Sequence, residues 1–441
     1  MKLKLYPQVL DTRLGTWWEG ISTSYWFVPV CMMLMSFCFY WASITSVTYE
    51  SVEYFVNNHL PDVSRDGAHQ ILTTIASAII TATSIAFSMT IVALTMASSQ
   101  FGPRLLRTFM YDKGTQIVLG LLVSTFLFCL FALYKVSNDA PQPASLSLLS
   151  GLAVGLATIN TFAIIFFIHH IARFIQADEV IYRCYRDCMH DIEEHLPQHR
   201  QQDNIAAIPE QLIEDSVYQI ALYFEQAGYV QTINITELLQ ASVPGMQGLD
   251  VHVRPGDYVL PDTPVVTIHS RYNHPVTELD GLLVFIVLGS RRTPVQDPEF
   301  TVGQLVELGV RALSPGINDP MTAISCLDKL TACCLTMSKR DFPAACITHK
   351  NNEIWLKRRT FSLQGIIEMA FNQIRQAGRS HMAVGLHILT CLKQLHQHLP
   401  DAAKPLAIEQ AHATYELVMS TSQSQADKND LEIAFTSFRN T

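Results

Sequence analysis

Four long apolar stretches, separated by polar loops, dominate the first part of the chain. A membrane-spanning helix needs about 20 predominantly apolar residues to cross roughly 30 Å of hydrocarbon, and each stretch meets that length. The pattern therefore predicts a four-helix transmembrane domain over residues 25–170, with spans at 25–47, 70–97, 115–136 and 146–168. The preceding residues 1–24 combine basic residues with tryptophan, which is typical of an amphipathic leader at the membrane surface.

Beyond residue 170 the pattern becomes that of a water-soluble protein. Residues 171–226 are predicted to form a helical linker, which a polar segment containing proline interrupts. Strand-like alternation and turn signals favour a β-rich, barrel-like domain over 227–290, and amphipathic periodicity favours a helical C-terminal domain over 291–441. The expected fold class is a multi-domain membrane protein, with four transmembrane helices and a cytosolic α+β region made of a barrel-sandwich-like domain and a helical bundle.

The composition agrees with a chain divided between membrane and water. Of the 441 residues, 49% are hydrophobic and 16% are charged, whereas soluble domains carry about 25% charged residues. The formal net charge of -9 does not indicate a broad basic surface for binding nucleic acid, so we expect no nucleic-acid partner. The ten cysteines lie in apolar stretches or in segments assigned to the cytosol, where thiols stay reduced.

The distribution of lysine and arginine predicts the orientation of the spans, because short cytoplasmic loops are enriched in both residues. The leader and the connection between the second and third spans are basic, with Lys2, Lys4, Arg104 and Arg107 among their residues. The loop between the first and second spans has four acidic residues against Arg65 alone. We therefore expect both termini in the cytoplasm.

The second span carries many hydroxyl groups for a helix in lipid. At about 100° per residue, most of its polar side chains fall within an arc of roughly 80° along one face. We call this set the hydroxyl stripe, and its members are Gln70, Thr73, Ser77, Thr81, Ser84, Ser88, Thr95 and Ser99. Thr74, Thr83 and Thr90 lie off the stripe and can bond to carbonyls of their own helix.

Two interpretations of the hydroxyl stripe remain open. It can pack against another helix, because small residues allow close approach and hydroxyls bond across the contact. It can instead line a water-filled path, because hydroxyls replace part of the hydration shell of an ion. The fourth span has its own small-residue spacing at Gly151 and Gly155, and this separate packing device favours the path. Since four spans form a narrow bundle, a path would require an oligomer with the second span on its axis.

Two helix starts are predicted in the cytosolic region, at Asp297-Pro298 and at Asp319-Pro320, because Asp caps helices and Pro suits the first helical position. Helix N-termini and arginine both favour anions. A small anionic or nucleotide-like cytosolic ligand therefore has a candidate site whose residues are Arg291, Arg292, Asn318 and Asp319. The alternative is that the arginines pair with acidic residues of the same segments, namely Asp297, Glu299 or Asp319.

Metal sites receive little support from the sequence. A helix would place Cys184, Cys188, Asp191 and His195 on one face, which permits a metal site. Cysteine often serves as a small core residue, however, so core packing is the favoured interpretation and no metal or cofactor is assigned. His169 and His170 are expected at the membrane interface. Four further histidines are expected on the surface or in the core, namely His381, His387, His396 and His398.

The β-rich segment around "RPGDYVLPDTP" resembles the hairpin halves of biotinyl and lipoyl carrier domains. Such carriers need a lysine at a hairpin tip to hold the cofactor. No lysine occurs between Arg200 and Glu299, so a carrier role is rejected and a structural or ligand-sensing domain remains.

Five strings along the chain together resemble one family, and they occur in this order: "ASSQFGPRLLRTFMYDKGTQIVLG", "HHIARFIQ", "RPGDYVLPDTP", "RRTPVQDPEF" and "RALSPGINDPMTA". The family is that of predicted bacterial membrane proteins catalogued as domain of unknown function twenty-two fifty-four. The resemblance implies a multi-pass protein of the bacterial inner membrane with a four-span region and a cytosolic region. It implies no activity and no catalytic residue.

The motifs of common enzyme classes are missing, including the Walker loop, the zinc-protease helix and the nucleophile elbow. No catalytic residue is assigned, and an enzyme of a nonstandard type would use the residues at the two helix starts. We expect an oligomeric ion channel or small-solute transporter, with the bilayer and further copies of the chain as partners. The hydroxyl stripe would line its path and the cytosolic region would gate it. The alternative is a membrane-anchored sensor or scaffold with the anion site described above.

Overall fold

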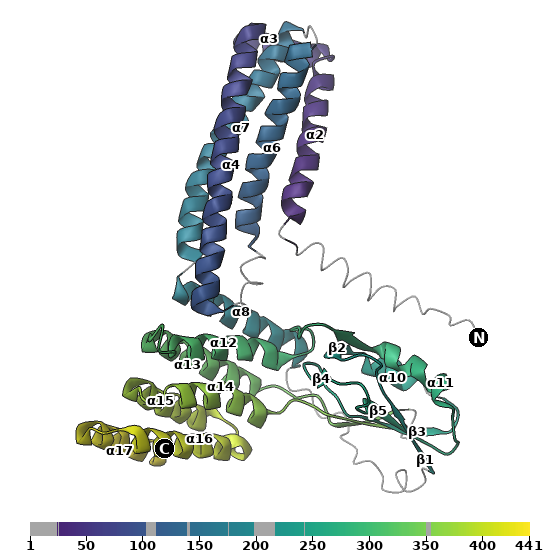
Figure 1. The fold of residues 1–441 in the computed structure, drawn as a ribbon, viewed down its shortest axis with the longest axis vertical. Coiled ribbons are helices and arrows are strands. Elements are labelled where there is room, and N and C mark those ends of the chain that lie inside the picture. The colour runs from purple at the N-terminus through teal and green to yellow at the C-terminus, as the bar shows by residue number, and fades with distance from the viewer. Residues whose placement is uncertain are drawn as a thin grey trace. The chain divides into compact units, whose positions relative to one another are not determined.

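The computed structural model describes residue 24 and residues 26–102, 112–138, 142–174, 176–197, 217–241, 243–349 and 354–441. The chain divides into two compact units, Met1–Glu179 and Val180–Thr441 (Figure 1). Nearly all of the predicted leader, the basic residues Arg104 and Arg107, and the polar segment of the linker lie outside the described residues.

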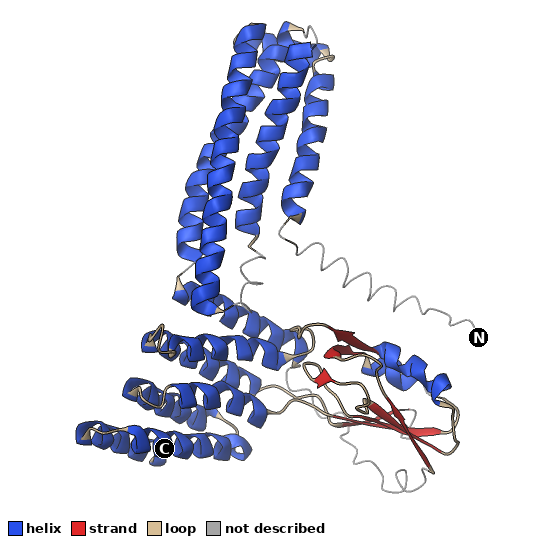
Figure 2. Ribbon diagram, viewed as in Figure 1, coloured by secondary structure: helices blue, strands red, loops and turns tan. Residues whose placement is uncertain are grey.

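Within the described residues of the first unit, four helices are long and apolar enough to cross a membrane (Figure 2). A short helix that was not predicted, α3 (Glu50–His59), joins the first two. The spanning helices are α2 (Phe27–Ser46), α4 (Arg65–Phe101), α6 (Lys113–Asn138) and α7 (Pro143–Phe174), so each predicted span coincides with one helix. At 1.5 Å per residue the 37 residues of α4 extend about 56 Å, well beyond the hydrocarbon thickness.

Helix α6 packs against α2, α4 and α7 and is the central helix of this unit. The start of α4 is tied to the end of α6, because Arg65 donates hydrogen bonds to the carbonyls of Val136 at 2.8 Å and Ser137 at 2.6 Å. An arginine at a helix C-terminus satisfies carbonyls that have no partner within the helix. At the other end α4 stops at Gly102, whose φ of 100° suits glycine.

The glycine spacing on the fourth span does not join two spans of one chain. A Cβ added to Gly151 would meet the side chain of Leu60 at 3.3 Å, in the connection before α4. A Cβ added to Gly155 would meet nothing within 4 Å, and Gly155 is exposed. The expectation that these glycines supply a packing device for the fourth span is therefore wrong within the chain, where α7 instead buries Ala153, Asn160 and Phe167.

The second unit combines helices with two small sheets. The five-stranded sheet has the order β1-β5-β3-β8-β7 and the three-stranded sheet the order β4-β2-β6. Neighbouring strands are antiparallel except β3 and β8, which are parallel. The strands are β1 (Tyr218–Leu222), β2 (Gly228–Ile233), β3 (Met246–Val251), β4 (Tyr258–Val259), β5 (Val266–Ser270), β6 (Ile286–Gly289), β7 (Cys346–His349) and β8 (Ile354–Arg358).

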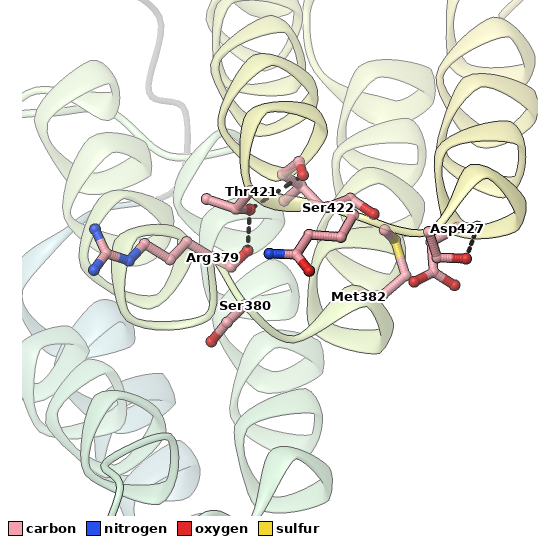
Figure 3. A pocket seen from close by; sticks show the side chains of 9 residues that line it. Arg379, Ser380, Met382, Thr421, Ser422 and Asp427 are labelled. Carbon is pink, nitrogen blue, oxygen red and sulfur yellow. Dashed lines mark hydrogen bonds between the residues drawn. The ribbon is translucent and has the colours of Figure 1, made fainter.

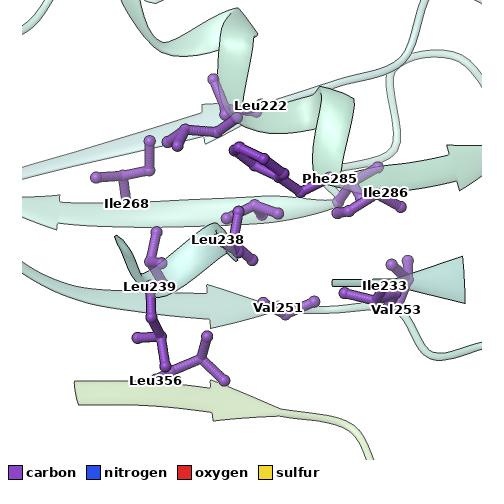
Figure 4. Packing of buried hydrophobic residues seen from close by; sticks show 14 of the residues in the cluster. Leu222, Ile233, Leu238, Leu239, Val251, Val253, Ile268, Phe285, Ile286 and Leu356 are labelled. Carbon is purple, nitrogen blue, oxygen red and sulfur yellow. The ribbon is translucent and has the colours of Figure 1, made fainter. Parts of the chain in front are cut away.

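The core of this β region is apolar and draws on segments far apart in sequence. It includes Leu222 of β1, Ile268 of β5 and Leu356 of β8 (Figure 4). Leu238 and Leu239 reach the same core from the short helix α10 (Ile235–Gln240). The indole of Trp355 lies over Gly248, where an added Cβ would overlap the ring, so this register of β3 and β8 requires a glycine.

The strands extend beyond the interval in which the sequence predicted them. β1 lies in the segment expected as a helical linker, and β7 and β8 lie in the segment expected to be helical. The apolar run "LLVFIVLGS" has the length of one buried strand, but it contains the end of the 3-10 helix η1 (Asp280–Phe285) followed by β6. Before η1 lies one turn of helix, α11 (Val276–Leu279).

The remaining helices of the second unit follow the amphipathic pattern of the sequence. α12 packs against α13 and α14, α13 against α15, and α15 against α16 and α17. As predicted, α12 and α13 begin at prolines that follow Asp297 and Asp319. The helices are α8 (Ala177–His195), α12 (Pro298–Ala312), α13 (Pro320–Met337), α14 (Leu363–Ala377), α15 (Met382–His398), α16 (Lys404–Thr421) and α17 (Gln425–Arg439), with the 3-10 turn η2 (Asp401–Ala403) before α16.

Candidate functional site

The hydroxyl stripe lies on the face of α4 that points away from the other helices of its own bundle. Every member of the stripe is exposed on the single chain. The packed face of α4 is lined largely by alanine, and its buried residues are Ala68, Leu72, Ala76, Ile79, Thr83, Ala86, Thr90, Ala93, Ala97 and Phe101. At about 100° per residue the centres of the two faces lie roughly 150° apart. The stripe is therefore not used for packing among the described helices of this bundle.

Several hydroxyls of the stripe bond to the backbone of α4 itself. Thr81 donates to the carbonyl of Ser77 at 2.9 Å, Ser84 to that of Ile80 at 3.0 Å, and Thr95 to that of Ile91 at 2.8 Å. A hydroxyl has one donor and two acceptor lone pairs. A hydroxyl bonded in this way has used its proton, so its oxygen can still accept a bond from water or coordinate a cation.

The threonines off the stripe behave as the sequence predicts. Thr83 donates to the carbonyl of Ile79 at 2.7 Å, and Thr90 donates to that of Ala86 at 2.8 Å. Both residues are buried in the bundle. Their donors are satisfied inside α4, so these buried threonines need no partner on another helix.

A second polar feature lies inside the bundle, between α6 and α7. Asn160 is fully buried, and its side-chain amide donates to the Thr125 hydroxyl at 2.7 Å and to the Leu156 carbonyl at 3.0 Å. The Asn160 Oδ1 has no hydrogen-bond partner among the described residues. A buried polar atom without a partner is uncommon and costly in a folded protein.

One titratable pair links the start of α6 to the end of α7. Asp112 accepts hydrogen bonds from the amide and hydroxyl of Thr115, and its Oδ2 lies 2.7 Å from Nε2 of His170. The close approach depends on Gly114, where an added Cβ would lie 2.9 Å from the same ring nitrogen. His170, expected only as a polar tip, thus has a specific partner.

In the second unit, Arg292 is paired with acidic residues at the start of α12. Its guanidinium donates two hydrogen bonds to the carboxylate of Asp297, which is fully buried, and lies 3.7 Å from Glu299. The hydrogen bond to Asp297 raises the pKa of Arg292, although burial opposes this effect. This pairing is the alternative to an anion site that the sequence also permits, and an anion at Arg292 would have to compete with Asp297.

A neighbouring ion pair was missed from the sequence. Arg254, in the turn after β3, makes a bidentate contact with Glu299 at 2.8 Å and stacks over the ring of Phe361. Asp257 of the same turn accepts from Arg359, which follows β8, at 2.9 Å. The strings "RPGDYVLPDTP" and "RRTPVQDPEF" therefore meet here. The charged residues in both strings were the sequence feature that could have indicated an ion pair between them.

The other three predicted anion-site residues make local contacts. Arg291 is exposed, and its carbonyl accepts from the amide of Gln231 at 3.0 Å. Asp319 caps α13 by accepting from the amide and hydroxyl of Thr322. Asn318 has a φ of 51° and donates its backbone N–H to Ser314. Within the described residues, no hydrogen bond or ion pair joins Arg291, Arg292, Asn318 and Asp319 to one another.

The cysteines of α8 are core residues. Cys184 and Cys188 are fully buried, and burial raises the pKa of the Cys184 thiol to about 12. Both ring nitrogens of His195 are engaged, since Nδ1 donates to the Asp191 carbonyl and Nε2 accepts from the Gln296 amide. These contacts support the core-packing interpretation of this face over a metal site.

A shallow pocket of about 250 Å³ lies between the α14–α15 turn and the α16–α17 turn (Figure 3). Thr421 donates across it to the carbonyl of Arg379 at 2.6 Å. Arg379 and Asp427 both line the pocket, so its walls carry one positive and one negative side chain and give no preference for the sign of a ligand.

With this arrangement described, comparison with known proteins places the chain in a family. The family model described as "Predicted membrane protein (DUF2254)" matches residues 22–394, so the chain belongs to that family, as the sequence strings indicate. The chain is similar to the Uncharacterized protein Mb1321c of Mycobacterium bovis and the Uncharacterized protein Rv1290c of Mycobacterium tuberculosis. Each is 27% identical over 371 residues, which cover 82% of this chain and 70% of the relative. No solved structure shows a significant match.

Proposed function

We propose that the chain assembles into an oligomer in the bacterial inner membrane, in which the hydroxyl stripe of α4 lines a path for an ion or small solute. The observation that carries this proposal is the placement of the stripe. Its residues are exposed and lie nearly opposite the packed face of α4. No charged residue interrupts the helix from Thr73 to Thr95, so the path is neutral along this length.

Facing the stripe toward lipid would leave hydroxyl oxygens and the amide of Gln70 in or beside hydrocarbon, where polar groups lack partners. The backbone bonds of Thr81, Ser84 and Thr95 lower this cost without removing it, because each oxygen keeps acceptor capacity. Assembly about an axis gives the stripe either water or the stripe of another copy as its neighbour. Cyclic symmetry would place the same face of every copy at the axis.

The proposed orientation has both termini in the cytoplasm, with the second unit as the gate. Only residues 175 and 176 separate the end of α7 from the start of α8. Helix α8 is attached to its own unit, because the Lys329 ammonium lies 5.2 Å from the Tyr185 ring centroid and Arg340 donates to the Leu196 carbonyl at 2.8 Å. A short connection to an attached helix is a direct route for transmitting movement to α7.

Single-channel recording in planar bilayers tests the proposal. We expect current steps from purified wild-type protein. Ser84→Leu should abolish or change them, because leucine narrows and dries a path, while Ser84→Ala should preserve them. Met89→Leu is the matched control, since Met89 is also exposed on α4 but lies off the stripe.

Two results would contradict the proposal. One is a folded, oligomeric wild-type protein that is silent while Ser84→Leu disrupts its assembly, because this outcome assigns the stripe to packing between copies. The other is a chain that is monomeric both in mild detergent and in bilayers, because a central path then cannot form.

The alternative of a membrane-anchored sensor with an anionic cytosolic ligand receives less support. Arg292 already pairs with Asp297, and Asp319 uses both carboxylate oxygens to cap α13. Arg291 is exposed and its side chain remains the accessible cation of the predicted set. Binding of a nucleotide or phosphate that survives Arg291→Gln would remove this residue from the sensor hypothesis.

A further inference from the structure

Three side chains with different metal-binding atoms meet between α13 and α15. Asp328 lies on α13, and His387 and Cys391 lie one turn apart on α15, on the same face of that helix. The His387 Nε2 is 2.7 Å from Oδ1 of Asp328, and the Cys391 sulfur is 4.0 Å from the same oxygen. The three ligand atoms all lie within 4.8 Å of one another.

These distances are close to those of a metal site. Zinc binds sulfur at about 2.3 Å and nitrogen or oxygen at about 2.0–2.2 Å, so tetrahedral ligand atoms lie on the order of 3.5 Å apart. The histidine and aspartate would have to separate slightly, and the cysteine and aspartate would have to approach slightly. Both of these changes are less than about 1 Å, and rotation of the Asp328 and His387 side chains can supply them.

The three side chains differ in burial, so that one side of the cluster is open to solvent. Cys391 is buried, whereas the side chains of His387 and Asp328 are 26% and 55% exposed. A thiolate, an imidazole and a carboxylate form a mixed ligand set that suits zinc rather than magnesium or calcium, which prefer oxygen alone. A fourth ligand, such as water, could enter from the exposed side.

We propose that Asp328, His387 and Cys391 form a binding site for a divalent transition metal of the zinc type, which joins α13 to α15. The histidine–aspartate contact alone would be an ordinary surface pair, and Cys391 alone would be an ordinary core residue. Their meeting at one point, from two helices, is what distinguishes this cluster from the scattered histidines expected from the sequence. The site is independent of the proposed path along α4.

Cobalt substitution tests the site, because a thiolate bound to Co²⁺ gives a charge-transfer absorption that other ligands do not. Full-length protein without a polyhistidine tag is stripped with a chelator and titrated with Co²⁺ in mild detergent. We expect about one equivalent to bind with tetrahedral visible bands and a thiolate band, and Zn²⁺ to displace it. Bound metal should also raise the unfolding temperature of wild-type protein, by an amount that grows with the logarithm of the metal concentration above the dissociation constant.

Variants assign the site to these residues. Cys391→Ala should remove the thiolate band, and His387→Asn and Asp328→Asn should each weaken cobalt binding by at least about tenfold. The last two change exposed or half-exposed groups, so they remain informative if Cys391→Ala fails to fold. Cys346→Ala and His398→Asn are matched controls and should bind as wild type. A wild-type protein without saturable cobalt binding, or an unchanged thiolate band in His387→Asn and Asp328→Asn at limiting metal, would overturn the proposal.

Discussion

Asn160 on α7 donates a hydrogen bond of 2.7 Å to the hydroxyl of Thr125 on α6, at a place where both side chains are buried. Thr125 in turn donates to the Leu121 carbonyl at 2.9 Å, so the hydroxyl is an acceptor for Asn160 and a donor within its own helix. This contact is a polar link between two spans of one chain. The residues of the hydroxyl stripe differ in this respect, because they are exposed on α4 and face away from the other helices of the bundle.

Removing this link should weaken the bundle modestly. Hydrogen bonds between membrane helices contribute about 0.6 kcal/mol on average and up to about 1.7 kcal/mol. Asn160→Ala should therefore lower the free energy of unfolding by about 0.6–1.7 kcal/mol. Thr161→Ala is the neighbouring control, because Thr161 is exposed and its hydroxyl donates to the Ala157 carbonyl of its own helix. Reversible unfolding in mixed detergent micelles measures both variants, and equal stability of the two would contradict a structural role for Asn160.

Loss of Arg292 should destabilise the second unit much more. Arg292→Met leaves the fully buried carboxylate of Asp297 without its main partner. Removing one partner of a buried ion pair costs about 3–5 kcal/mol, and we expect the lower end because Arg292 is 34% exposed. Denaturant unfolding checks this against Arg291→Met, whose side chain is exposed. Similar midpoints for the two variants would show that the pair contributes little.

Gly256 should not tolerate a side chain. Its φ of 93° is unfavourable for other residues, and an added Cβ would collide with the carboxylate of Asp297 and approach Arg292 at 2.9 Å. Gly256→Ala should therefore cost more than about 2 kcal/mol, since backbone strain and disruption of the ion pair act together. Gly281→Ala is the control, because nothing lies within 4 Å of its added Cβ and its φ is not positive. A thermal shift assay that ranks the two variants equally would contradict this account.

The Asp112–His170 contact should make the membrane unit sensitive to acid. Burial raises the pKa of Asp112, but hydrogen bonds from Thr115 and the contact with His170 outweigh burial and lower it overall. A lowered folded-state pKa means that this stabilisation is present above the unfolded pKa of about 3.9 and is lost as pH falls through the folded value.

Asp112→Asn should flatten this acid dependence while it keeps an oxygen able to cap α6. Thermal unfolding between about pH 3 and 6 compares it with wild type, which should lose stability toward the acid end. Asp66→Asn, a change at an exposed acid in the first turn of α4, should retain the wild-type profile. An Asp112→Asn protein that keeps the wild-type slope would contradict a role for the carboxylate.

Features that depend on local periodicity followed from the sequence. The four spans and the helix starts at Pro298 and Pro320 agree with the structure. The hydroxyl stripe is of the same kind, since the angle between side chains on a helix is set by the helix itself. Its separation from the buried face of α4 required knowledge of where the neighbouring helices pack.

Features that depend on distant partners did not follow from the sequence. The parallel pairing of β8 with β3, the Arg254–Glu299 contact and the meeting of Asp328 with His387 each join segments well separated along the chain. A strand satisfies its backbone groups with another strand, and a buried charge with another charge, so neither partner is encoded in the neighbouring residues. A helix satisfies its backbone hydrogen bonds within a single segment, and for that reason the membrane spans could be predicted from their residues. The contacts of the second unit depend on distant segments, so only the packed fold decided them.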